Sequence, residues 1–220
     1  MNEYDKYLHP SYSQEGEDRI ILDLFCDVSK GNYVDVGSHH PVRFSNTHLF
    51  YLNGWRGINI DPTPGTKVIF DEVRKEDINL EIGIGAKEEI KTLFMYEDHA
   101  INTFDKSRVE FIYEITKQKV KEERQVKIKT LKSVLEENEM PRIDFMNIDV
   151  EWDEINVLKS NDWKRLRPKV LLVEILDFKI DSLKENQIHQ FLNEISYSFL
   201  CKTPRTCFYQ DKTNPTRYSP

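Results

Sequence analysis

Glycine and aspartate follow two short apolar stretches of the chain, and their order and spacing could serve nucleotide chemistry. The first stretch ends in Asp35-Val36-Gly37, and the second ends in Asp61, 24 residues after Gly37. A glycine at a strand end permits a tight turn and lets the backbone approach a ligand. An acid at the end of the next strand can accept hydrogen bonds from both ribose hydroxyls. Singly, they could be a turn glycine and a helix N-cap before Pro62. Together they favour an adenosine-type ligand.

The turn around Gly37 narrows the class of this ligand. A dinucleotide site needs three glycines, for the turn, for the pyrophosphate and for helix packing. The turn here contains one glycine, and the bulky His39 and His40 follow where a pyrophosphate would need room. The chain also lacks a Walker A motif. These features disfavour NAD and ATP, whereas S-adenosylmethionine carries no phosphate and tolerates such a turn.

Alternating strands and helices would bring the strand-end residues together. Short β-branched and aromatic runs predict strands, and apolar residues at helical spacing predict helices. The alternation predicts an α/β protein with a mostly parallel sheet and helices on both faces, and a final antiparallel hairpin. The predicted strands are 32–37, 58–61, 78–84, 92–96, 125–130, 143–150 and 169–175, the hairpin is 197–211, and the helices are 13–25, 39–51, 66–74, 104–123, 131–139, 154–161 and 185–195.

Length and charge exclude several function classes. The 220 residues predict a single domain, 1–220, and the net charge of -7 argues against a partner such as nucleic acid or a polybasic contact with membranes. No apolar run approaches the roughly 20 residues of a membrane span. The charged N-terminus has no apolar signal region, so we expect a cytoplasmic location. The chain also lacks a motif for gripping a flipped base.

Several blocks of the sequence follow one another in a specific order: residues 12–18 (YSQEGED), 33–41 (YVDVGSHHP), 43–47 (RFSNT), 54–62 (GWRGINIDP), 143–151 (IDFMNIDVE), 158–163 (LKSNDW) and 167–170 (RPKV). Taken in order, these blocks resemble the FkbM family of S-adenosylmethionine-dependent methyltransferases. The resemblance covers about residues 11–176. It implies a class I, Rossmann-like methyltransferase with a seven-stranded sheet that has one reversed strand. It also implies O-methylation of a hydroxyl, often on a sugar of a surface glycan.

The class I reading assigns cofactor roles by position. Asp35 and Gly37, with Ser38 beside them, should frame the methionine moiety of S-adenosylmethionine, and Asp61 should hold the ribose. Ile84 should lie near the adenine, and Asp149 near the cofactor amino group or the acceptor. The family signature further implies that Gln14 and Glu17 close over the cofactor, as part of an N-terminal helical segment, 1–30, that covers the site.

Catalysis of methyl transfer to an alcohol needs a base, and four residues could serve. His40 and His39 directly follow the cofactor turn, and an imidazole titrates near neutral pH. Either histidine could instead cap a helix or bind substrate. Glu151 is the next candidate, and its alternative is a structural carboxylate paired with an arginine. His99 is a weaker one.

The acceptor side is defined less sharply by the sequence. Arg43 could pair with an anionic acceptor or form a surface salt bridge, and we place Asn46 and Trp152 beside it. The family commonly has glycine where Trp152 stands, so the acceptor pocket is expected to differ. Residues 97–125 could form a lid or a solvated helix. No metal is indicated, because zinc-like spacing is missing and the strand-end acids have a use in cofactor binding.

Two other functions compete with O-methylation of a small-molecule or glycan acceptor. A nicotinamide-dependent oxidoreductase on a similar sheet is disfavoured by the missing glycines. A non-catalytic cofactor-binding module would keep Gly37 and Asp61 without turnover, and Trp152 lends it some support. An amine or a phosphate-derived oxygen also stays open as the methyl acceptor. The sequence does not determine the oligomeric state.

Overall fold

The main sheet of the protein has seven strands, and its strand order creates the switch point at which ligands bind. The computed structural model describes residues 3–140, 142–176 and 179–216. Along the sheet the order is β3-β2-β1-β7-β8-β10-β9. These strands are β1 (Asn32–Val36), β2 (Arg56–Ile60), β3 (Ile78–Leu80), β7 (Phe145–Ile148), β8 (Val170–Glu174), β9 (Tyr197–Lys202) and β10 (Thr206–Asp211).

The central strands are buried on both faces, which explains their nearly continuous apolar sequences. β1, β7 and β8 pair in parallel, and the side chains of Val170 to Val173 in β8 have no exposed area. Parallel sheets covered by helices on both sides require such runs. The sequence prediction of a mostly parallel sheet is therefore confirmed.

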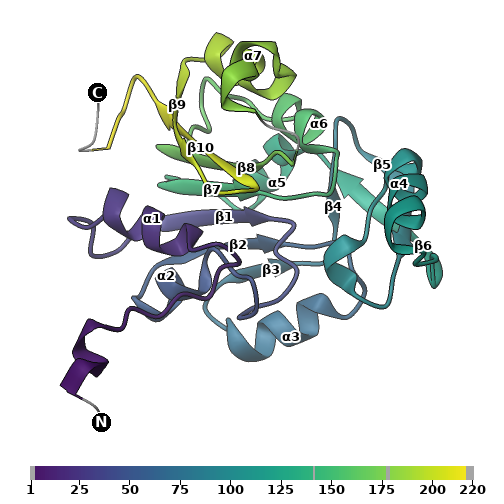
Figure 1. Ribbon diagram of the computed structural model, residues 1–220, viewed down its shortest axis with the longest axis horizontal. Coiled ribbons are helices and arrows are strands. Elements are labelled where there is room, and N and C mark those ends of the chain that lie inside the picture. Colours follow the sequence, from purple (N-terminus) through teal and green to yellow (C-terminus); the bar gives the residue numbers. More distant parts are fainter. Residues whose placement is uncertain (1–2, 141, 177–178, 217–220) are drawn as a thin grey trace.

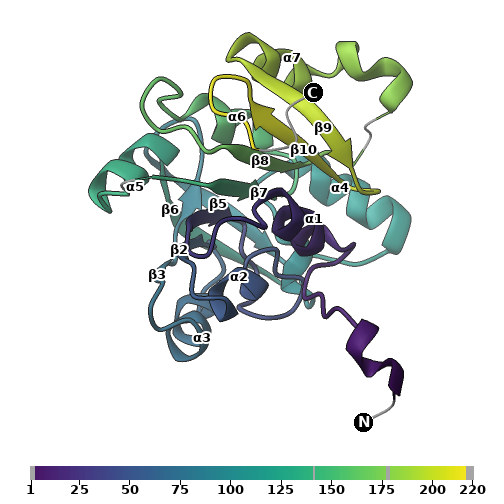
Figure 2. The same ribbon diagram turned by 90° about the vertical axis from the view of Figure 1, so that its left-hand side faces the viewer.

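Helices cover the two faces of this sheet, as Figure 1 shows. On one face, α1 (Glu17–Leu24) and α2 (His48–Leu52) pack an aromatic core around Phe50 and Phe145. On the other face, α5 (Leu131–Glu137), α6 (Glu154–Lys159) and α7 (Gln187–Glu194) contribute leucines and isoleucines to the larger core. The helix α3 (Thr66–Val73) follows β2 and lies beside α2 (Figure 2). Among the described residues, no helix has both the length and the apolar character to cross a membrane.

The reversed strand is β10, and it lies inside the sheet rather than at its edge. β10 pairs antiparallel with both β8 and β9, so β9 at the edge runs in the same direction as β8. Every residue of β10 is buried, whereas most of β9 is only half-buried. The fully buried strand of the hairpin is thus the inner one, although its sequence is no more apolar than that of β9. The hairpin prediction is confirmed: the hairpin ends the sheet, and β10 is its antiparallel strand.

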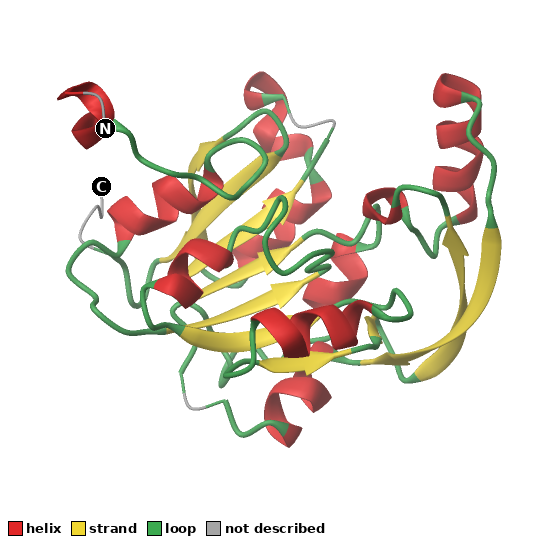
Figure 3. Ribbon diagram, turned by 90° about the horizontal axis from the view of Figure 1, so that it is seen from below, coloured by secondary structure: helices red, strands yellow, loops and turns green. Residues whose placement is uncertain are grey.

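A second, smaller sheet stands to one side of the main one (Figure 3). Its order is β4-β6-β5, with β4 (Gly83–Ile84), β5 (Glu89–Met95) and β6 (Glu122–Lys129). The strand predicted over 78–84 is therefore two strands in two sheets. Gly83 permits this transfer, because a Cβ there would lie 2.5 Å from a side-chain carbon of Ile128 in β6. The short helices are η1 (Glu3–Tyr7), η2 (His99–Ile101) and η3 (Ile180–Glu185), and α4 (Lys106–Thr116) precedes β6.

Two predicted helices begin later in the structure than the sequence indicated. α2 begins only at His48, because His39 and Phe44 adopt positive φ angles of 53° and 56° that no helix contains. α1 begins at Glu17 after Gly16, whose φ is 89°. The carboxylate of Asp18 instead binds the residues before the helix, accepting a hydrogen bond from the hydroxyl of Ser13 at 3.0 Å. The segment 39–47 is thus a loop, free to line a cavity.

Candidate active site

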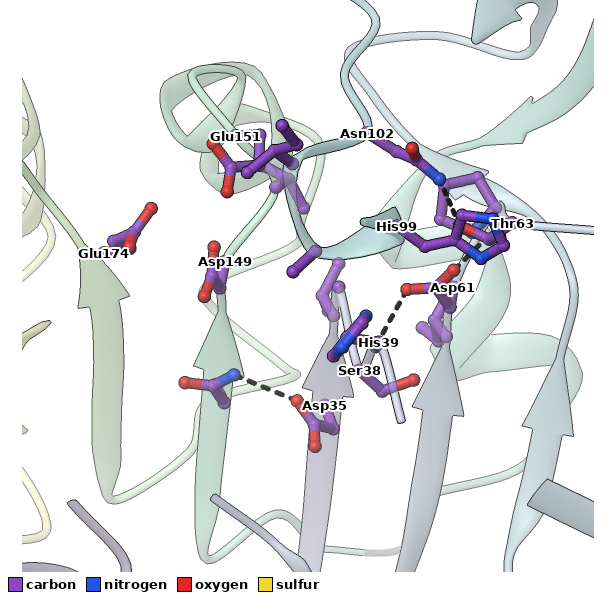
Figure 4. A pocket seen from close by; sticks show the side chains of 18 of the residues that line it. Asp35, Ser38, His39, Asp61, Thr63, His99, Asn102, Asp149, Glu151 and Glu174 are labelled. Carbon is purple, nitrogen blue, oxygen red and sulfur yellow. Dashed lines mark hydrogen bonds between the residues drawn. The ribbon is translucent and has the colours of Figure 1, made fainter. Parts of the chain in front are cut away.

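A cavity of about 360 Å³ opens at the carboxyl ends of β1, β2, β7 and β8. This volume lies within the range of small-molecule sites. Figure 4 shows the strand-end side chains pointing into one space, with the segment that contains His99 and Asn102 on the opposite wall. Of the residues predicted for the site, those that line the cavity are Gln14, Asp35, Gly37, Ser38, His39, Asn46, Asp61, Ile84, His99, Asp149 and Glu151.

Gly37 is required at the end of β1 by the neighbouring strand. A Cβ atom at this position would lie 1.6 Å from the backbone oxygen of Asp149, just after β7, and the φ angle of Gly37 is 83°. Both the close approach and the positive φ exclude a side chain. The sequence suggested that this glycine admits a ligand. The structure shows that it also lets β1 and β7 converge at the cavity floor.

Asp61 holds the two loops that meet beside the cavity. One carboxylate oxygen accepts a hydrogen bond from the backbone N–H of His39 at 2.8 Å, and the other accepts one from the N–H of Thr63, also at 2.8 Å. Each carboxylate oxygen has two lone pairs. The buried Asp61 can therefore accept one further hydrogen bond on each oxygen, as a pair of vicinal hydroxyls would require.

The two histidines after Gly37 have different surroundings. The Nε2 atom of His39 is buried without a hydrogen-bond partner, and its side chain lines the cavity. His40 lies outside the cavity lining, and its Nδ1 accepts hydrogen bonds from the N–H groups of Val42 and Arg43 at 3.1 and 3.0 Å. Burial lowers the pKa of both imidazoles. The neutral His39 is the one that can take a proton inside the cavity.

Acidic side chains gather at the ends of β7 and β8. Oxygen atoms of Asp149, Glu154 and Glu174 lie within 4.8 Å of one another. Burial, with the nearby charge of Glu174, raises the pKa of Asp149 well above its usual range. Burial likewise raises the pKa of Glu154 and of Glu174 to about 7. The cluster can therefore store protons near neutral pH and suits a positively charged group.

Acidic side chains outnumber basic ones in the cavity wall. Asp35, Asp61, Asp149 and Glu174 form no ion pair with lysine or arginine in the described parts of the chain. The remaining acids of the lining are paired: Asp98 with Arg43, Asp153 with Lys91 and Glu151 with Arg108. A concave site in which acids predominate attracts positively charged groups, because such a group favours the ionised form of each acid. The cavity thus favours a cation.

Glu151 and Trp152 form a strained turn that is tied to α4. Their φ angles are 55° and 85°, in the left-handed region that ordinarily favours glycine. Arg108 of α4 donates two hydrogen bonds to Oε2 of Glu151, at 3.0 and 2.6 Å, and stacks over the Trp152 ring at 5.0 Å. Phe111 contacts the same ring, with 5.1 Å between centroids. Trp152 itself lies outside the cavity lining. Glu151 is thus engaged by Arg108, the arrangement named above as the alternative to a base.

The segments predicted to cover the site contribute unequally. Within 97–125, the residues around His99 and Arg108 wall the cavity, whereas the exposed end of α4 does not. Gln14 lines the cavity, but Glu17 lies outside the lining and accepts hydrogen bonds at the turn between β9 and β10, from Thr206 at 3.3 Å. The helix η1 projects away from the body of the molecule (Figures 1 and 2).

The residues predicted for the acceptor side are also divided. Arg43 is exposed and forms a surface ion pair with Asp98 at 3.7 Å, outside the cavity lining. Asn46 lines the cavity and donates a hydrogen bond to Asn147 at 2.9 Å. Two residues predicted for the cofactor side are buried: Ser38, whose hydroxyl has no hydrogen-bond partner, and Ile84 in β4. The structure therefore brings Asn46 to the site and leaves Arg43 at the surface.

Sequence reasoning missed several residues that build the site. Asn147 and Thr47 donate hydrogen bonds to Asp35 at 2.9 and 2.8 Å. Asn147 could have been found, since it lies two residues before Asp149 on a strand, and alternate side chains share a face. Thr63 and Asn102, joined by a 3.0 Å hydrogen bond across the cavity, carry no such signal.

Together, the strand order with one reversed strand inserted before the last, and the cavity above the switch point, define a class I methyltransferase fold. The sequence matches the family described as Methyltransferase FkbM domain over residues 35–199. The chain therefore belongs to the FkbM methyltransferase domain family, and it is a methyltransferase by family and fold.

Comparisons with solved structures find methyltransferases of distant sequence. A precorrin-6y C5,15-methyltransferase from Geobacter metallireducens GS-15 is 11% identical, with 93% of each chain covered and a TM-score of 0.42. The METTL16 methyltransferase domain is 10% identical, with 87% of this chain and 64% of that chain covered and a TM-score of 0.44. A search of curated proteins found none that matches this chain.

Proposed function

We propose that this protein is an S-adenosylmethionine-dependent O-methyltransferase that methylates a hydroxyl of a sugar or glycan precursor in the cytoplasm. One observation carries the proposal: the strand-end cavity combines Asp61, which has free lone pairs on both oxygens, with a lining rich in unpaired carboxylates. S-adenosylmethionine has a ribose with two hydroxyls and a cationic end. The cavity matches both features.

The residues of the lining suit the parts of this cofactor in turn. Asp61 would accept hydrogen bonds from the ribose hydroxyls. Ile84, with Phe104 beside it in the lining, offers an apolar surface for the adenine. Asp35 and Asp149 lie toward the middle of the sheet, and their carboxylates would bind the cationic methionine end. The absence of an unpaired lysine or arginine in the described lining matches a cofactor that has no phosphate.

Bound S-adenosylmethionine supplies an activated methyl group on its sulfonium sulfur. The protein must then align the acceptor oxygen and remove its proton. We assign that proton to Nε2 of His39, because this atom is buried at the cavity without another partner. His40 and Glu151 are engaged elsewhere, by backbone N–H groups and by Arg108. The lining disfavours an acceptor that is anionic near the reacting hydroxyl.

The proposal is tested first by calorimetric titration of the wild-type protein with S-adenosylhomocysteine and, separately, with NAD. We expect S-adenosylhomocysteine to bind with a Kd in the micromolar range, which corresponds to a binding free energy of about −8 kcal/mol. Binding of NAD alone would refute the methyltransferase assignment of the cavity. Binding of neither would favour a module without cofactor.

The acceptor is then identified by turnover. Nucleotide sugars, neutral sugars and glycan fragments are incubated with S-adenosylmethionine, and release of S-adenosylhomocysteine is measured. A His39→Gln variant should bind S-adenosylhomocysteine as the wild type does and lose at least about 100-fold in rate, the usual contribution of a general base. A wild-type rate in this variant would remove His39 from that role.

A further inference from the structure

A buried hydrogen-bond chain behind the cavity ends on Asp35. Asp35 is 2% exposed and lines the cavity from β1. Its Oδ2 accepts a hydrogen bond from the hydroxyl of Thr47 at 2.8 Å, and its Oδ1 accepts one from the amide of Asn147 at 2.9 Å. Thr47 has no exposed area, and Asn147 is 5% exposed. Each carboxylate oxygen thus has its own buried donor.

The direction of both donors is set by residues further from the cavity. Arg74 donates to Oγ1 of Thr47 at 3.1 Å. A guanidinium can only donate, so Oγ1 must accept from it, and the single hydroxyl hydrogen of Thr47 is left for Asp35. On the other side, Asn46 donates to the carbonyl oxygen of Asn147 at 2.9 Å, which turns the amide hydrogens of Asn147 toward Asp35.

Arg74 is itself held rigidly in the protein interior. It has no exposed area, and it donates to Asp77 at 2.9 Å, to the hydroxyl of Tyr33 at 2.6 Å and to the backbone oxygen of Pro41 at 3.1 Å. A buried charge needs such a complete set of partners. These partners fix the orientation of the Arg74 guanidinium. The hydrogen-bond chain therefore has one direction, with each donor pointing from Arg74 toward the cavity.

We propose that Thr47 and Asn147 are positioning residues that orient the Asp35 carboxyl group and aim its remaining lone pairs at the cavity, so that binding of the cationic end of the cofactor depends on them. This inference rests on the proposed function. Thr47 lies outside the cavity lining and Asn147 lies within it, and each acts on the cofactor through the Asp35 carboxyl group. The arrangement connects α2 and the end of α3 to the cofactor side of the cavity.

Two opposing influences act on the pKa of Asp35, and the rise caused by burial is the larger. Burial raises the pKa of Asp35, while the hydrogen bonds from Asn147 and Thr47 lower it. Loss of either donor would leave burial less opposed and raise the pKa further. The charged and titratable groups near Asp35 are Arg74 at the end of α3, Asp61 after β2, Asp149 after β7, His39 after β1 and His48 in α2.

The experiment is calorimetric titration of Thr47→Val with S-adenosylhomocysteine between pH 6 and pH 8.5. The variant keeps the shape of threonine and removes the hydroxyl. We expect affinity at pH 7 to fall about tenfold or more, the effect of one hydrogen bond to a charged group. Affinity should fall on acidification as Asp35 takes up a proton, and in the variant this fall should begin at a higher pH than in the wild type. Thr47→Ser should restore both the affinity and the pH profile.

A matched control separates this role from general destabilisation. The buried hydroxyl of Thr216 donates to Gln210 at 2.6 Å, away from the cavity lining, so Thr216→Val should bind as the wild type does. Wild-type affinity and pH profile in Thr47→Val would overturn the inference, as would equal losses in both valine variants. If Thr47→Val does not fold, Asn147→Leu removes the donor to the other oxygen and is judged by the same criteria. No binding by the wild type would refute the proposed function instead.

Discussion

The positive φ angle of Trp152 leads to an unusual prediction about stability. A non-glycine residue in the left-handed region costs about 1–2 kcal/mol. The φ angle of Trp152 is 85°, and its ring is held by Phe111 and Arg108 at 5.1 and 5.0 Å. The aromatic pair contributes about 0.5–1.5 kcal/mol and the cation–π contact about 0.5–1 kcal/mol. The ring contacts therefore offset the backbone cost.

Two substitutions separate these contributions. Trp152→Ala loses the ring contacts and keeps the backbone cost, so we expect it to lower the free energy of unfolding by about 1–2.5 kcal/mol. Trp152→Gly loses the same contacts, but it removes the free-energy cost of the positive φ angle. Part of this gain is cancelled, because glycine increases the conformational entropy of the unfolded chain. We expect it to be more stable than Trp152→Ala by about 1 kcal/mol, the reverse of the usual order.

Urea denaturation of the three proteins measures this difference, provided the slope of the transition is unchanged. Trp163 is the matched control, since it is a buried tryptophan in a turn and is not among the described residues with positive φ. At this position, Trp163→Gly should be no more stable than Trp163→Ala. If Trp152→Ala equals or exceeds Trp152→Gly in stability, the reasoning from backbone strain is refuted.

Three further predictions follow from the strand-end residues. Gly37→Ala places a methyl group 1.6 Å from the Asp149 oxygen, so it should destabilise the protein by more than about 3 kcal/mol or prevent folding, as urea denaturation would show. Asp61→Ala should lose measurable binding of S-adenosylhomocysteine in calorimetry and also lower stability by about 1–3 kcal/mol, because two N–H groups lose their acceptor; undiminished affinity would remove Asp61 from the ribose role. Burial raises the pKa of Glu154 to about 7 from 4.5, so the folded protein keeps a proton that the unfolded chain releases, and stability should fall as pH rises from 4.5 to 7. The free energy of unfolding of Glu154→Gln should fall less than that of the wild type between pH 4.5 and pH 7. Identical pH profiles of the two proteins would contradict the raised pKa of Glu154.

Most of the main sheet could be predicted because its central strands are short and mainly apolar. The runs at β1, β2, β7 and β8 were recognisable from short β-branched sequences, and the helices between them from their spacing. The boundary at 78–84 could not be predicted. A single apolar run does not reveal that its two halves pair with different sheets, since this depends on where β6 lies.

The candidate site shows the same division between local pattern and tertiary packing. Gly37 and Asp61 were identified because a strand-end glycine and acid are local features of the sequence. The choice between His39 and His40 could not be made from residue types. It depends on the backbone of the loop, in which His39 has a φ of 53° and N–H groups engage His40. Adjacent identical residues have no distinguishing pattern in the sequence, so the fold of the loop decides which one faces the cavity.

The sequence by itself therefore determined the order of strands and helices, the family and the edge of the sheet at which the site lies. These follow from residue types that act within a few positions of one another, namely apolar periodicity and strand-end residues. Only the tertiary structure decided which donors hold Asp35, because one of them, Asn147, is 112 residues away in the chain. Hydrogen bonds and close approaches between distant segments depend on the packed backbone, to which each residue contributes only a small part.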